Sequence, residues 1–113
     1  MNGVLVVDKP AGISSARALN PVKRALGRDV RVGHAGTLDP FATGVLLVMV
    51  GDATRLMPLV GKLSKHYQGR ARLGRQTDTL DPEGAVTHEV DPGPYNPSGL
   101  NAALVALRGQ VEQ

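Results

Sequence analysis

The chain has 113 residues, of which 42% are hydrophobic, and this length and composition fit one small globular domain. It contains no cysteine and only three scattered histidines, which excludes a disulfide framework and argues against a zinc centre. No apolar run approaches the length of a membrane span, and the first residues lack a signal-peptide pattern. We therefore expect a soluble, cytoplasmic protein that holds no metal.

The charges are distributed unevenly along the chain. The net charge is +3, but residues 1–75 hold twelve Lys and Arg against four Asp and Glu, whereas residues 76–113 hold one against six. The basic residues form two clusters, Arg17, Lys23, Arg24, Arg28 and Arg31, then Arg55, Lys62, Lys65, Arg70, Arg72 and Arg75. Such asymmetry favours a surface that binds a polyanion, although ordinary solvated faces would give the same pattern. Three aromatic residues are too few for a broad base-stacking platform.

The first elements are a strand and an interrupted helix. Residues 3–7 form a short apolar run that predicts a strand. Ser14 or Ser15 is expected to cap the helix that follows. Because Pro21 would break that helix, Asn20 is interpreted as a new N-cap and Pro21 as the first turn of a second helical segment.

The middle of the chain predicts a buried strand between two helices. The second helical segment covers residues 22–26, with Gly27 as its stop. Residues 45–50 are continuously apolar, which is typical of a central strand covered on both faces. Asp52 is then expected to cap a helix that extends through Leu63.

The last third predicts two strands and a helix. Residues 66–73 alternate between apolar and polar side chains, which indicates a strand with Tyr67 on its apolar face. A turn at residues 81–84 precedes a strand at residues 85–90, and Ser98 is expected to cap a final helix. The whole pattern indicates an α+β fold.

Residues 33–44 are the most informative segment of the chain. They place three glycines, one proline, one histidine and one aspartate within twelve residues, directly before the apolar run at 45–50. Glycine and proline at this density fix a tightly turned backbone, so Asp39 is positioned rather than freely solvated. The structural alternative is that Asp39 only caps its own turn through an Asx hydrogen bond.

Residues 33–44 match every fixed position of the sequence G-H-x-G-x-L-D-P-x-A-T-G. This string resembles the signature of the TruB family of pseudouridine synthases, which isomerise the T-loop uridine of transfer RNA. Further blocks resemble this family in its order and spacing, at residues 3–15, 51–55, 65–67 and 73–84. The resemblance implies an α+β fold with a mixed, mainly antiparallel sheet and flanking helices, and a reaction that needs no cofactor.

The resemblance also assigns roles to individual residues. It implies that Asp39 is the catalytic aspartate, and that Tyr67 is both a catalytic residue and a stacking platform for the target base. Because that uridine lies inside a folded loop, it must be flipped out, and His34 matches the family histidine that fills the vacated space. Whether Asp39 attacks the base or acts at the sugar stays open.

The remaining assignments are supporting ones. Lys9, Arg55 and Lys65 are expected to contact phosphate groups or the active site, although each could be an ordinary solvated cation. Asp78 is expected to give structural or charge-pairing support, and could hold an arginine near Asp39. The turn residues Gly33, Gly36, Pro40 and Gly44 are expected to shape the loop.

The resemblance implies that residues 1–113 are the N-terminal part of a catalytic domain whose C-terminal remainder, including an arginine that pairs with the catalytic aspartate, is absent. The expected partner is the T-arm stem-loop of transfer RNA, bound by a parent enzyme that is monomeric, while the isolated fragment is expected to be inactive. Two alternatives remain. One is a non-catalytic RNA-binding or RNA-folding module, and the other is the catalytic subunit of a guide-RNA-dependent synthase.

Overall fold

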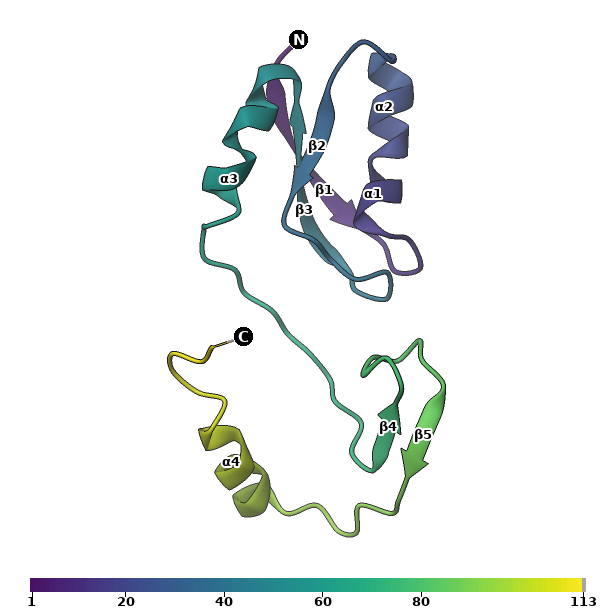
Figure 1. Ribbon diagram of the computed structural model, residues 1–113, viewed down its shortest axis with the longest axis vertical. Helices are drawn as coiled ribbons and strands as arrows, with labels where there is room; N and C mark the ends of the chain where they lie inside the picture. The colour runs from purple at the N-terminus through teal and green to yellow at the C-terminus, as the bar shows by residue number, and fades with distance from the viewer. Residues whose placement is uncertain (113) are drawn as a thin grey trace. The chain divides into compact units, whose positions relative to one another are not determined.

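The computed structural model describes residues 1–112, which divide into two compact units. The first unit covers residues 1–68 and the second begins at Gly69. The first contains a three-stranded sheet with helices, and the second a two-stranded hairpin and one helix (Figure 1). This is the α+β architecture that the sequence predicts.

The sheet of the first unit is antiparallel, with strand order β1-β3-β2. β1 covers Gly3–Lys9, β2 covers Val32–Ala35, and β3 covers Gly44–Val50. The predicted central strand is confirmed, and the first strand continues two residues beyond its predicted end. β2 was not predicted, because Gly33 and Ala35 interrupt any apolar alternation; its pairing with β3 defines it.

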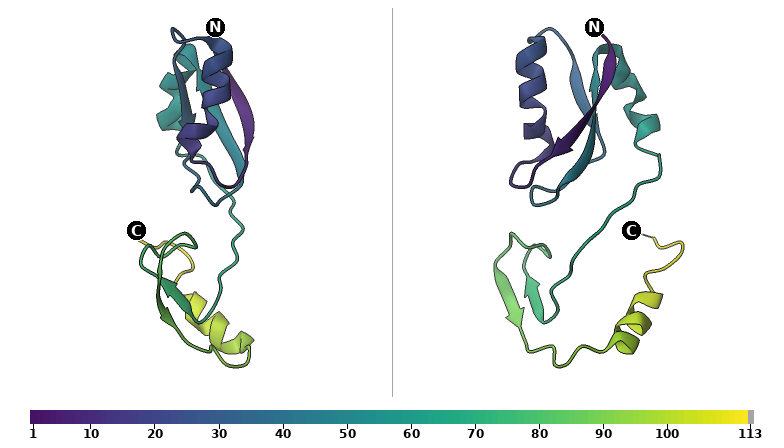
Figure 2. Two further views of the ribbon diagram at one scale, coloured as in Figure 1. Left: turned by 90° about the vertical axis from the view of Figure 1, so that its right-hand side faces the viewer. Right: turned by 180° about the vertical axis from the view of Figure 1, so that it is seen from behind.

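One face of the sheet carries the hydrophobic core. Leu46 and Val48 of β3 are 1% and 0% exposed, and they cluster with Ala18 and Leu19. Four partly buried residues from the outer strands, the loop after β1 and the second helix pack around this cluster, namely Val7, Ile13, Val22 and Val32. Helices α1 (Ser15–Ala18) and α2 (Asn20–Leu26) cover this face, whereas η1 (Gly51–Leu56) and α3 (Met57–Val60) lie on the other side of the sheet (Figure 2).

Two short helices make up the covering layer. α1 covers Ser15–Ala18 and is capped by Ser14, whose Oγ accepts a hydrogen bond from the Arg17 N–H at 3.2 Å. α2 covers Asn20–Leu26. Pro21 lies in its first turn and Gly27 ends it, as predicted. The prediction that Asn20 caps α2 is wrong, because Leu19 holds the cap position with a helical backbone that continues directly from α1.

The segment after β3 differs from its prediction. A 3-10 helix, η1, covers Gly51–Leu56, and the short α3 covers Met57–Val60. The predicted helix from Asp52 to Leu63 is therefore wrong at both ends. Val50 holds the cap position, and the Asp52 carboxylate instead accepts hydrogen bonds from Arg31 Nη2 and Asn2 Nδ2, both at 3.4 Å.

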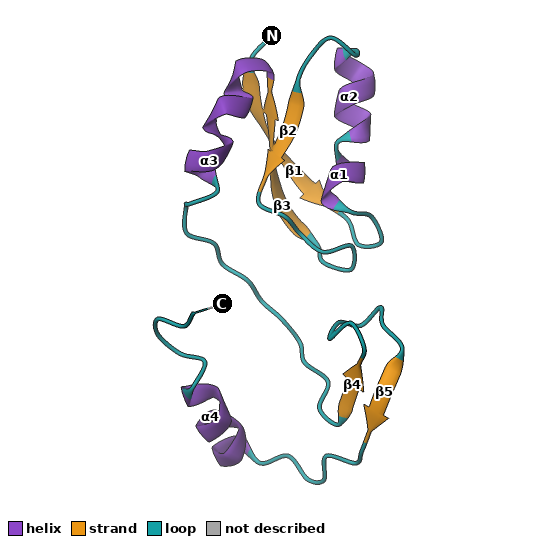
Figure 3. Ribbon diagram, in the orientation of Figure 1, coloured by secondary structure: helices purple, strands orange, loops and turns teal. Residues whose placement is uncertain are grey.

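A long loop follows α3, and the predicted strand at residues 66–73 lies within it (Figure 3). That prediction is wrong. Alternation makes a segment suitable for a sheet, but a strand exists only where a neighbouring backbone pairs with it, and no strand of the described chain pairs with these residues. Tyr67 consequently lies in a loop, 66% exposed.

The second unit is a hairpin followed by a helix. β4 covers Arg75–Thr77 and pairs with β5, Val86–Glu89, which falls inside the predicted strand. α4 covers Pro97–Val105. The prediction that Ser98 caps α4 is wrong: the Asn96 Oδ1 accepts the hydrogen bond from the Gly99 N–H at 3.1 Å. None of the described residues of this unit is fully buried.

The buried core allows a prediction of how substitutions change the free energy of unfolding. Leu46→Ala removes a fully buried side chain and leaves a cavity, so we expect the free energy of unfolding to fall by about 2–5 kcal/mol. Val6→Ala is the matched control, because Val6 is 71% exposed on the same sheet and its loss should cost under about 0.5 kcal/mol. Urea denaturation measures both. Equal losses would contradict the assignment of the core.

Candidate functional site

The signature segment, residues 33–44, runs from β2 through the connecting loop to the first residue of β3, and Asp39 lies in that loop. Asp39 is exposed, and its backbone carbonyl accepts a hydrogen bond from the Ala42 N–H at 3.0 Å. Within residues 1–112, no hydrogen bond or ion pair engages its carboxylate, so the Asx-capped turn of the structural alternative is not formed. The carboxylate is open to solvent on a backbone that is held from both sides.

Lys9 supplies one of these constraints. Its side chain is completely buried, and Nζ donates hydrogen bonds to the carbonyl oxygens of Ile13, Pro10 and Pro40 at 2.7, 2.8 and 3.3 Å. The Gly12 N–H also donates to the Pro40 carbonyl, at 2.8 Å. The loop after β1 is thereby tied to the residue that follows Asp39. Lys9 was expected to contact phosphate groups or the active site; in the structure its ammonium is buried and engaged by these three carbonyls.

Ser15 supplies the constraint on the other side of Asp39. Its side chain is 2% exposed, and Oγ both accepts a hydrogen bond from the Leu38 N–H and donates one to the Leu38 carbonyl, each at 2.9 Å. Both backbone groups of Leu38 are thus satisfied by one hydroxyl. Sequence reasoning considered Ser15 only as a helix cap, since a contact across 23 residues leaves no local signal in the sequence.

His34 lies on β2, opposite Val48 of β3, and is partly buried. Its Nδ1 is 3.1 Å from the Gly36 carbonyl oxygen, which fixes the imidazole against the start of the loop. The adjacent Gly33 packs closely against α3: a Cβ at this position would lie 2.8 Å from the Met57 Sδ, so a larger residue would require the flexible Met57 side chain to move.

The side chain of a second lysine, Lys65, lies close to Gly36 of this loop. The φ of Gly36 is +82°, a conformation that other residues rarely adopt, and a Cβ there would lie 3.8 Å from the Lys65 Cε. Lys65 therefore lies beside the signature loop, with Nζ donating to the carbonyls of Gly61 and Leu63 at 2.6 and 3.2 Å. Gly44, the first residue of β3, also has a positive φ, of +132°. Of the other expected site residues in this unit, Arg55 is an exposed residue of η1.

Asp78 lies in the second unit, where it supports a turn. Its Oδ1 accepts a hydrogen bond from the Ala85 N–H at 2.9 Å, which closes the loop between β4 and β5. In the same loop, hydrogen bonds from the Thr79 hydroxyl and the Glu83 N–H hold the pKa of Asp81 below its ordinary value. Sequence reasoning did not single out Asp81, although it belongs to the same motif.

Two further observations concern metal binding and membrane crossing by the described residues. Across residues 1–112, His, Asp and Glu do not gather in groups of three that could hold a metal ion. In the same part of the chain, no helix combines the length and the apolar character that a membrane crossing requires. The last residue of the expected domain, Gln113, lies outside the described residues.

The double hydrogen bond of Ser15 can be tested by Ser15→Ala. We expect the free energy of unfolding to fall by about 1–3 kcal/mol, because both backbone groups of Leu38 lose their buried partner. Ser64→Ala, at an exposed position, is the control and should change little. Thermal denaturation gives both values. A Ser15→Ala chain as stable as the control would show that Ser15 does not hold the loop.

Comparisons with known proteins identify the family of this chain. The model of the TruB family pseudouridylate synthase (N terminal domain) matches residues 23–113. Proteins named tRNA pseudouridine synthase B are similar over nearly the whole chain: 46% identical in Cutibacterium acnes over 99% of this chain, 44% in Escherichia coli strain K12 over 100%, and 41% in Syntrophotalea carbinolica over 100%. The chain spans 38%, 35% and 37% of these relatives, respectively. On these matches, the chain belongs to the TruB family of pseudouridylate synthases.

Proposed function

We propose that this chain is the N-terminal part of an enzyme that isomerises a T-loop uridine of transfer RNA to pseudouridine. The observation that carries the proposal is Asp39, an exposed carboxylate without a partner in the described residues, on a loop fixed by Lys9 on one side and Ser15 on the other. The similar proteins are named for transfer-RNA pseudouridine synthesis, which supports the same substrate.

The reaction defines what the site must supply. The bond between N1 of uracil and C1′ of ribose breaks, the base rotates, and a bond forms between C5 and C1′. The proton on C5 is then removed and N1 ends protonated, so the product is an isomer and no external reactant is consumed. This sequence needs a positioned carboxylate that acts as a nucleophile or at the sugar, and a base for the C5 proton.

We assign the carboxylate role to Asp39 and the C5 proton acceptor to Tyr67. A tight, anchored turn supports the first assignment, because positioning accounts for much of the rate that a catalytic group provides. Tyr67 lies in the exposed loop after α3, two residues beyond Lys65, whose side chain lies beside Gly36 of the signature loop. This proximity along the chain supports a role for Tyr67 near Asp39.

The other expected residues take binding roles in the proposal. His34 would fill the space that the flipped uridine vacates, since its ring is held at the start of the loop by Gly36. Lys65 and Arg55 would contact phosphate groups. Lys9 is removed from this set, because its ammonium is buried and engaged by three carbonyls. Asp78 keeps a structural role.

The assignment of Asp39 can be tested in a chimera that joins this chain to the remaining C-terminal part of the Escherichia coli relative. On a T-arm stem-loop RNA, we expect the chimera to form pseudouridine and Asp39→Asn to lower the rate about 10⁴-fold or more, because the reacting carboxylate is lost. Mass spectrometry of the digested RNA measures the product. Asp52→Asn is the matched control, since Asp52 is also exposed but is paired with Arg31.

Three outcomes would contradict the proposal. Equal rates for the wild-type and Asp39→Asn chimeras would remove Asp39 from the chemistry. Tight binding of the T-arm RNA without product would favour a non-catalytic RNA-binding or RNA-folding module. Product that forms only after a guide RNA and protein partners are added would favour a guide-RNA-dependent synthase.

A further inference from the structure

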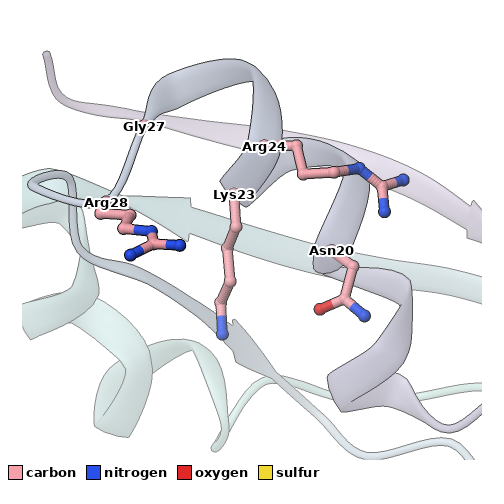
Figure 4. A pocket seen from close by; sticks show the side chains of 5 residues that line it. All are labelled: Asn20, Lys23, Arg24, Gly27 and Arg28. Carbon is pink, nitrogen blue, oxygen red and sulfur yellow. The ribbon is translucent and has the colours of Figure 1, made fainter.

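A basic hollow lies along α2, from its first residue to the turn that follows the helix, and the proposed chemistry does not use it. The hollow has a volume of about 410 Å³ and is lined by Asn20, Lys23, Arg24, Gly27 and Arg28, which we call the α2 hollow (Figure 4). Three of its five lining residues are cations, and all five are exposed. We propose that the α2 hollow binds the phosphate backbone of an RNA at a point distant from the nucleotide that reacts.

The local structure explains why these side chains gather. Asn20, Lys23 and Gly27 are spaced by three and four residues, so they share one face of α2. Gly27 ends the helix with a φ of +84°, and the turn that it makes brings Arg28 back beside this face. In Figure 4 the side chains of Asn20, Lys23 and Arg28 extend on the same side of the helix.

The cations of the hollow are not neutralised within the described chain. The ion pairs among residues 1–112 join Arg31 to Asp52, and Arg72 and Arg75 to Glu89. Asp29 follows Arg28 directly in the sequence, yet it forms no ion pair in this set. Cations in the last turn of a helix interact favourably with its dipole, but that effect explains neither Arg28, which lies beyond the helix, nor the hollow.

The two helices between Ser15 and the hollow limit the distance from the hollow to the Asp39 loop. α1 begins at Ser15, which is bonded to Leu38, and the two helices run from there to Leu26 along the length of the sheet (Figure 1). At about 1.5 Å per helical residue, the path from Ser15 reaches the near edge of the hollow at Asn20 after about 8 Å and the end of α2 after about 17 Å. A path of this length spans several phosphates of a nucleic-acid strand, because successive phosphates are only a few ångströms apart. One RNA stem can contact both.

An RNA backbone fits this site better than a small anion does. The hollow is open, and its guanidinium, ammonium and amide groups are donors that bind phosphate oxygens without reading sequence. Such contacts fix the register of a nucleic acid and leave the chemistry to another site. The choice of RNA as the polyanion rests on the proposed function, whereas the hollow and its charge do not.

The first test measures RNA binding by this 113-residue chain as a function of salt. Each phosphate contact contributes about 0.7–0.9 to the slope of log K against log salt, so Lys23→Gln with Arg28→Gln should lower the slope by about 1.4–1.8. At 0.1 M salt, each lost contact should weaken the binding of a T-arm stem-loop roughly fivefold. Fluorescence anisotropy of labelled RNA measures both quantities.

The matched control removes the same charge elsewhere. Arg31→Gln with Arg72→Gln also deletes two cations, but both are already paired with carboxylates, so we expect less than half of the effect. Lys23→Arg with Arg28→Lys keeps the charge and should bind within about twofold of wild type. Circular dichroism verifies that every variant retains its helices. Unchanged slopes in the Gln variants of the hollow, or equal losses in both charge-deleting pairs, would overturn the inference.

A second test separates this inference from the proposed function. In the chimera with the Escherichia coli C-terminal part, Arg28→Gln should raise KM about fivefold and leave kcat unchanged, because Arg28 does not touch the reacting nucleotide. A fall in kcat at constant KM would overturn the inference. If the chimera makes no pseudouridine, the proposed function fails and the salt-dependent binding still decides the α2 hollow. If product forms but the binding slope is unchanged, only the hollow fails.

Discussion

The buried ammonium of Lys9 is the interaction on which the candidate site depends. A buried charge without a partner is costly, and no carboxylate among residues 1–112 pairs with Lys9. Three carbonyl oxygens of two loops compensate its charge instead. The antiparallel register brings these loops together, because Lys9 at the end of β1 pairs with Gly44 at the start of β3. The turn that carries Asp39 is therefore held to the first loop at Pro40. An exposed carboxylate on a fixed backbone is the arrangement that the proposed reaction requires.

Much of the first unit could be predicted from the sequence, because its strongest signals are local. The apolar run at 45–50 and the stop at Gly27 each indicate their element without tertiary information, and both predictions are confirmed. Two of the failures have tertiary causes. Asp52 is a good helix cap by residue type, but Arg31 and Asn2 engage its side chain. The segment 66–73 alternates as a strand should, but no described strand pairs with it.

The residues of the candidate site also fall into two groups, those that the sequence indicates and those that only the structure identifies. The signature motif gave Asp39, His34 and the turn glycines as candidates, because tight turns and unusual residue combinations are visible in sequence. The structure shows that Lys9 is buried, which no sequence pattern reveals. It also added Ser15, whose hydroxyl reaches a backbone 23 residues away. The α2 hollow is likewise a tertiary feature, since the sequence shows a basic cluster but not which of its cations are paired with carboxylates.

The most direct test of this account is amide hydrogen exchange at Gly12, whose N–H donates to the Pro40 carbonyl, in the wild-type chain and in Lys9→Met. Methionine fills a similar volume but cannot donate to the three carbonyls, so the account predicts at least about tenfold faster exchange at Gly12, with the central-strand amide of Val48 changed far less. Lys62→Met, at an exposed position, is the control. Unchanged protection of Gly12 in Lys9→Met would show that the ammonium does not hold the Asp39 loop.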